Sequence, residues 1–170
     1  MTSNMRVALA AVIVLAACDS PEQQKAKAQA KARTAVSAES AKASAARTAP
    51  ATGRWDDAHL VDRLVRAGLA TQAVKDAAPP PYWAAPVAVA YTVGQATLYA
   101  YIYPDSTSRK RATAALDTVS LAPKGTASPY AVPRVLIEQN NLAAVLVGGS
   151  DRQQERVQLA ITAGLPVAAP

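Results

Sequence analysis

The sequence has few of the residues from which proteins build disulfides, metal sites and catalytic centres. Its 170 residues include a single cysteine and a single histidine, His59. One cysteine excludes an intramolecular disulfide, and a lone histidine without partners at ligand spacing is rarely a metal ligand or a catalytic base. We also find no Gly-x-Ser-x-Gly motif and no paired acidic motif. The sequence therefore predicts no catalytic residue, no metal site and no cofactor.

Excess positive charge is small in the part of the chain that can fold. The formal net charge is +6, but residues 54–170 hold eleven basic and nine acidic side chains, whereas residues 19–53 hold six basic and three acidic ones. A mildly basic segment beside anionic lipid headgroups accounts for the excess, because each Lys or Arg near such a surface adds about 1 kcal/mol of attraction. We therefore expect no nucleic-acid partner.

Long hydrophobic runs are absent as well. The apolar run at residues 7–17 has eleven residues and follows Arg6, the only charged side chain before it. A membrane-spanning helix needs about 20 apolar residues, whereas the apolar region of a signal peptide has about 7 to 15 behind a positive start. Residues 1–17 are therefore interpreted as a signal peptide, and translation starts at either Met1 or Met5.

The apolar run ends in Leu15-Ala16-Ala17-Cys18, which resembles the lipobox of bacterial lipoproteins. The resemblance covers only residues 1–20. It implies cleavage between Ala17 and Cys18, a diacylglyceryl group on the Cys18 sulfur and acylation of the new amino group. Two or more acyl chains anchor a protein stably, so the chain is expected on the extracytoplasmic, periplasmic side of a bacterial membrane. Asp19 favours the inner membrane, because lipoproteins of enteric bacteria with Asp at this position tend to stay there.

Residues 18–53 have the composition of a spacer. Val36 is the only large aliphatic residue between Asp19 and Gly53, so this segment cannot form a core. Alanine, lysine and glutamine are strong helix formers, and we expect partial helix over residues 22–35. Such a helix has no apolar stripe and would have nothing to pack against. The spacer is therefore predicted to be a solvated tether of fluctuating helicity.

Residues 54–170 have the pattern of a small α+β domain in the order helix, hairpin, helix, hairpin, helix. The order predicts a four-stranded, mostly antiparallel sheet with about three helices packed on it. The sequence does not give the pairing order of the two hairpins. The expected helices follow Asp56, Ser106 and Ser150, and the expected hairpin turns are Gly94-Gln95 and Asn140-Asn141.

The turn at Gly94-Gln95 fixes the register of the first hairpin. Glycine at the first position of a two-residue turn favours type II′, which sets Val93 opposite Ala96 and continues along both strands. One face is then uniformly apolar. The other face carries a row of three tyrosines beside small residues: Tyr99, Tyr101 and Tyr103.

The tyrosine row has two interpretations. Tyrosine offers apolar area with a polar tip, so an exposed row could bind a protein, a sugar or single-stranded bases. Alternatively, the rings fill the space above small residues and are partly covered by a helix. The first interpretation makes the domain a non-catalytic interaction module for another envelope protein or polymer, and it predicts that all three rings are exposed.

A ligand-binding or enzymatic domain is the alternative. It would need a pocket between the sheet and loop 120–134 that gathers acidic side chains from Asp105, Asp117, Glu138 or Asp151. The helix after Ser106 is expected to run to Val119, with the basic residues 109–111 on a solvated face. The Gly148-Gly149 turn, which could hold an anion with the help of Arg152, is interpreted as a plain helix cap.

Overall fold

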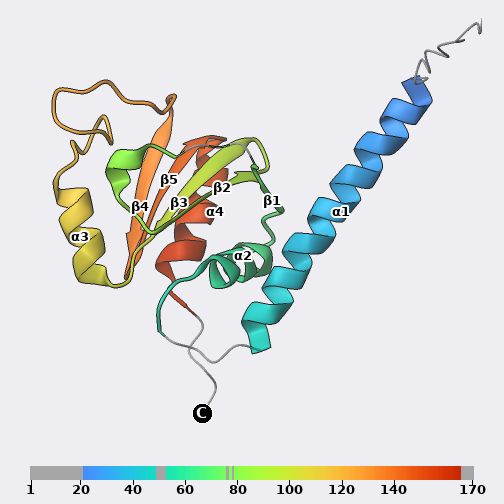
Figure 1. Ribbon diagram of the computed structural model, residues 1–170, viewed down its shortest axis with the longest axis horizontal. Helices are drawn as coiled ribbons and strands as arrows, with labels where there is room; N and C mark the ends of the chain where they lie inside the picture. Colours follow the sequence, from blue (N-terminus) through green and yellow to red (C-terminus); the bar gives the residue numbers. More distant parts are fainter. Residues whose placement is uncertain (1–20, 49–52, 76, 78, 166–170) are drawn as a thin grey trace, which may run out of the picture.

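The computed structural model describes residues 21–48, 53–75, 77 and 79–165 (Figure 1). The predicted α+β class is confirmed, with an open antiparallel sheet in the strand order β1-β2-β3-β5-β4. Residues 1–17, which were interpreted as a signal peptide, lie outside the described residues together with Cys18 and Asp19. The elements are α1 Pro21–Thr48, α2 Asp57–Arg66, β1 Thr71–Ala73, the 3-10 helix η1 Pro81–Trp83, β2 Val87–Val93, β3 Ala96–Ile102, α3 Ser106–Ala114, β4 Arg134–Gln139, β5 Leu142–Gly148 and α4 Asp151–Thr162.

Three further elements, two of them short, make the described architecture larger than expected. Strand β1 adds a fifth strand to the predicted four, and η1 and α1 raise the helix count from about three to five. Strand β1 has only three residues, which is too few for an alternating pattern to be visible in the sequence. It forms through pairing with β2, in which Thr71 lies opposite Val93.

Both predicted hairpins are confirmed. In the first, Val93 pairs with Ala96 and Val87 with Ile102, and Gly94 has a φ of 58°. The second hairpin turns at Asn140-Asn141, with Gln139 opposite Leu142. Strands β3 and β5 pair along their whole length, so the two hairpins join through their second strands.

The sheet separates two hydrophobic cores. Helices α2 and α4 cover one face, where the first core gathers residues such as Leu60, Leu98 and Ile161. Helix α3, η1 and the loop of residues 115–133 cover the other face, where Trp83 and the tyrosines other than Tyr91 form the second core (Figure 1). The sheet is therefore buried on both faces.

Local capping sets the ends of the helices around the sheet. The Asp56 side chain accepts a hydrogen bond from the His59 amide and caps α2. At the other end of α2, the Leu69 amide bonds to the Leu64 carbonyl, and Gly68 adopts a φ of 71° that suits glycine. Helix α4 begins after the cap Ser150 and buries Val157, Ala160 and Ile161, as predicted.

Helix α3 ends earlier than the sequence suggests. It stops at Ala114 instead of running to Val119, which is 74% exposed. The Asp117 carboxylate accepts hydrogen bonds from the Val119 and Ser120 amides, a local turn that competes with helix continuation. The chain therefore turns back after Leu116, which is buried.

Helix α1 is continuous from Pro21 to Thr48 and extends well beyond the rest of the molecule (Figure 1). The expectation that it has nothing to pack against is wrong for its last turns, which contact α2 and β1. Ala43 is fully buried and belongs to the first core. A small side chain, rather than an apolar stripe, allows this contact, which is why the sequence pattern does not reveal it.

Candidate functional site

The tyrosine row on β3 lies in the second core. Tyr101 is fully buried, Tyr103 is 4% exposed and Tyr99 is half-buried. The Trp83 ring stacks on Tyr101, with ring centroids 4.3 Å apart and planes 7° from parallel. The prediction of an exposed row is therefore wrong for Tyr101 and Tyr103, because η1 and the loop cover them.

Hydrogen bonds fix these rings to the segments that cover them. The Tyr101 and Tyr130 hydroxyls are 2.6 Å apart, and the Tyr103 hydroxyl donates to the Trp83 carbonyl at 2.7 Å. Burial raises the pKa of Tyr103 and of Tyr130 to about 12, and it raises the pKa of Tyr101 further. The phenols therefore stay protonated at neutral pH, and the rings act as internal supports for η1 and the loop.

The loop that was expected to border a pocket packs directly on this face of the sheet. Leu121 is 3% exposed and Tyr130 is 6% exposed, and both belong to the second core. The Tyr130 ring also contacts Tyr99, with centroids 5.3 Å apart. Leu121 and Tyr130 therefore pack against the sheet on the side where the enzymatic alternative needs a pocket.

The acidic side chains of that alternative have separate structural roles. Asp105 caps α3, and hydrogen bonds from Ser108 lower its pKa. Hydrogen bonds from the Ser120 and Val119 amides lower the pKa of Asp117 in the same way. Glu138 forms an ion pair with Arg109, and Asp151 lies in the first turn of α4. Among the described residues, no three His, Cys, Asp or Glu side chains are grouped as metal ligands would be.

Arg109 corrects the expectation of a solvated basic run at residues 109–111. It is only 8% exposed, with Nη1 at 2.5 Å from the Glu138 carboxylate and Nε donating to the Asn140 carbonyl at 2.8 Å. A buried charge is tolerated when it is paired and hydrogen-bonded in this way. Arg109 therefore attaches α3 to the β4–β5 hairpin, while Lys110 and Arg111 are exposed as predicted.

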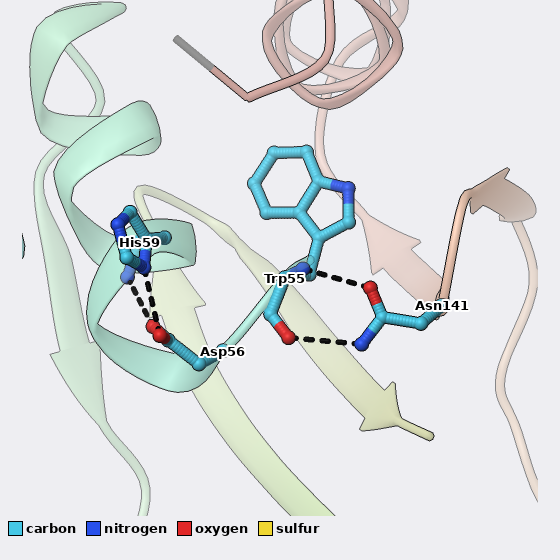
Figure 2. Close-up of polar contacts among 4 residues, drawn as sticks. All are labelled: Trp55, Asp56, His59 and Asn141. Atoms are coloured by element: carbon cyan, nitrogen blue, oxygen red, sulfur yellow. Dashed lines mark hydrogen bonds and ion pairs between the residues drawn. The ribbon is translucent and has the colours of Figure 1, made fainter. Parts of the chain in front are cut away.

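A buried asparagine joins the start of α2 to the same hairpin (Figure 2). The Asn141 side chain accepts a hydrogen bond from the Trp55 amide at 2.7 Å and donates to the Trp55 carbonyl at 2.9 Å. Its amide also donates to the Tyr103 carbonyl at 2.8 Å. Asn141 and Trp55 are each 2% exposed. The sequence indicates only that Asn141 is a turn residue, and no pattern in it predicts that the side chain binds the start of α2.

The single histidine lies on the neighbouring turn in Figure 2. His59 Nδ1 is 2.8 Å from a carboxylate oxygen of Asp56, the residue that also caps α2 through the His59 backbone. The His59 ring is largely buried. This pair fixes the first turn of α2.

Helix α1 docks on the first core through a polar contact. Lys42 Nζ lies 2.7 Å from the Asp57 carboxylate and 3.3 Å from the Tyr91 hydroxyl, and Tyr91 donates a hydrogen bond to Asp57. The next residue of α1, Ala43, is buried in the first core, which also contains Tyr91. The contact connects α1 to α2 and β2, and sequence reasoning missed it because Lys42 and Tyr91 are 49 positions apart in the chain.

The turn at Gly148-Gly149 lies beside a shallow depression at one end of the sheet. The depression has a volume of about 420 Å³, and its lining includes Arg152, Gln153 and Arg156. The Ser150 side chain accepts from the Gln153 amide, as a plain helix cap does. The interpretation of this turn as a cap is therefore confirmed.

The described residues contain no helix that is long and apolar enough to cross a membrane. The four residues that resemble a lipobox, Leu15, Ala16, Ala17 and Cys18, lie outside the described residues. No family model, curated protein or solved structure matches the chain.

Proposed function

We propose that the chain is a bacterial envelope lipoprotein. Residues 1–17 are removed, lipid on Cys18 anchors the chain to the membrane, and the remainder projects on the extracytoplasmic side. The observation that carries this proposal is the position of Leu15-Ala16-Ala17-Cys18 at the end of an apolar run of eleven residues, with the only cysteine of the chain in the lipidated position. Lipidation accounts for the presence of a single cysteine in the chain.

Helix α1 supports this proposal because it begins three residues after Cys18. Its 28 residues span about 42 Å at 1.5 Å per residue. Side chains over most of its length are exposed, and Lys25, Lys27, Lys31 and Arg33 lie in its first half. Positive charge near the anchored end favours anionic headgroups. In this proposal α1 is a stalk that separates the domain from the membrane.

The domain at the end of the stalk is proposed to be a non-catalytic module that binds another envelope protein or polymer. Its histidine and the acidic side chains Asp105, Asp117 and Glu138 all have contacts that stabilise helix ends, turns or the hairpin. Tyr101 and Tyr103 are buried and stabilise the fold. Tyr99 is the only member of the row that remains substantially accessible to solvent. The partner-binding surface is therefore expected elsewhere on the domain.

Changing Cys18 to serine tests the anchor. The unchanged chain, expressed in a bacterium, is expected to begin at Cys18, to carry the mass of its acyl chains, to incorporate labelled palmitate and to partition with membranes. The Cys18→Ser chain should lose all of these properties, because serine has no thiol to receive the diacylglyceryl group. Intact mass and membrane fractionation measure the result.

Ser20→Ala is the matched control, since it changes a small polar residue two positions beyond Cys18 and leaves the lipobox intact. It should behave as the unchanged chain does. An unlipidated, soluble chain in all three cases would reject the proposed anchor.

The docking of α1 is tested by Ala43→Glu. A carboxylate at this fully buried position must be dehydrated or must push the helix away. We expect a loss of about 2 kcal/mol or more in the free energy of unfolding. We also expect faster amide hydrogen exchange in the last turns of α1. Ala41→Glu is the control because Ala41 is exposed in the same helix. Equal exchange in the two variants would show that α1 does not depend on this contact.

A further inference from the structure

The two edges of the sheet differ in how well they are closed. Strand β1 forms one edge, has only three residues and is contacted by α1. Strand β4 forms the other edge and has six residues, Arg134–Gln139. An edge strand presents a row of unpaired backbone groups that can add a further strand. The β4 edge is therefore the place where the sheet can be extended.

The register of the β4–β5 hairpin shows which backbone groups point outward. Residues of an antiparallel strand alternate between bonding to one neighbour and pointing away from it. The Gly148 amide bonds to the Pro133 carbonyl, so odd-numbered residues of β4 face β5. The N–H and C=O groups of Arg134, Leu136 and Glu138 therefore point outward. Within the described part of the chain, no hydrogen bond reaches them.

The side chains of these three residues are complementary to the same three side chains of a second copy of the chain. Arg134 and Glu138 have opposite charges and lie two positions on either side of Leu136. If a second β4 pairs antiparallel with Leu136 opposite Leu136, each Arg134 lies opposite a Glu138. A shift of two residues separates these charges, and parallel pairing sets like charges side by side. Only this register pairs all three outward residues of both copies and also sets each Arg134 opposite a Glu138.

The surroundings of the β4 edge are also apolar where β4 begins. Val119 and Val132 are 74% and 75% exposed, the largest values among the exposed large hydrophobic residues described. Val132 lies two residues before β4, and the Val119 carbonyl accepts a hydrogen bond from Arg134 Nη2 at 2.7 Å. Val132 therefore lies close to the start of the edge strand, and Val119 lies next to the Arg134 side chain.

We propose that two copies of this chain associate through their β4 edges, antiparallel and centred on Leu136, so that two five-stranded sheets form one continuous sheet. Three residue pairs exchange backbone hydrogen bonds, and two of them set Arg134 of one copy opposite Glu138 of the other. The inference depends on the sheet edge alone and is independent of the lipid anchor.

Disulfide formation by Leu136→Cys tests this register. The full chain carries Cys18→Ser in addition, so that the engineered thiol is the only one, and it is oxidised in mild detergent. Opposed Cα atoms of a hydrogen-bonded antiparallel pair are about 5.5 Å apart, within the range that a disulfide bridges. Gln139→Cys is the control, because its two copies would be about 20 Å apart in this register. We expect at least about tenfold more covalent dimer for Leu136→Cys, given that geometric difference.

Sedimentation of the chain without an engineered cysteine provides a second measurement that does not depend on the folding of a variant. A dimeric mass together with selective cross-linking of Leu136→Cys supports the proposal. A monomeric mass at all concentrations, a dimer in which Leu136→Cys cross-links no better than Gln139→Cys, or cross-linking of Leu136→Cys to a different protein in intact cells would each overturn it.

Discussion

Replacing Tyr101 with alanine should lower the free energy of unfolding by about 3 to 5 kcal/mol, the usual cost of removing a large buried aromatic side chain. Tyr101 is fully buried, stacks on Trp83 and shares a hydrogen bond with Tyr130. Its loss removes the centre of the second core, so η1 and the loop lose their support together. Denaturant unfolding followed by tryptophan fluorescence measures the effect.

Two control variants separate the ring of Tyr101 from its hydroxyl and from its neighbour. Tyr101→Phe keeps the stack on Trp83 and should cost about 1 kcal/mol, the typical net value of one hydrogen bond. Tyr99→Ala removes a half-buried ring on the same face and should cost less than Tyr101→Ala. If Tyr99→Ala were the more damaging change, the central position of Tyr101 in the second core would be wrong.

The hairpins were predictable because their information is local. Gly94 restricts the turn, and the alternation of apolar and other residues on either side then sets every pair from Val87 to Ile102. The three tyrosines were placed correctly on one face for the same reason. Their burial was not predictable, because the segments that cover them carry no periodic pattern and fold over the sheet through Trp83 and Tyr130.

Single long-range contacts explain the other differences between expectation and structure. Ala43 packs into the first core because it is small, and a small residue in an alanine-rich helix gives no pattern. Arg109 can be buried because Glu138 lies next to it in space. The sequence does not reveal this pair, since its two residues are 29 positions apart. Charge and composition describe what a segment can do alone, whereas these residues depend on partners that only the fold supplies.

Asn141→Ala should be comparably destabilising although it removes only a small polar side chain. The change leaves three backbone groups without their hydrogen bonds to the Asn141 side chain. These are the amide and the carbonyl of Trp55, drawn in Figure 2, and the Tyr103 carbonyl. An unsatisfied buried polar group costs about 1 to 3 kcal/mol. Because Trp55 and Tyr103 are nearly inaccessible to water, we expect a total loss of about 3 to 5 kcal/mol, allowing for partial relaxation.

The neighbouring asparagine offers a close control. Asn140 is exposed, has a φ of 50° and donates one hydrogen bond to the Gly53 carbonyl. Glycine adopts this φ without strain, so Asn140→Gly should change the free energy of unfolding by less than about 1 kcal/mol, as exposed substitutions usually do. Asn141→Asp should be at least as damaging as Asn141→Ala, because a carboxylate oxygen would replace the donor that faces two carbonyls. Equal stability of the Asn140 and Asn141 variants would mean that the start of α2 is held to the hairpin by the packing of Trp55 alone.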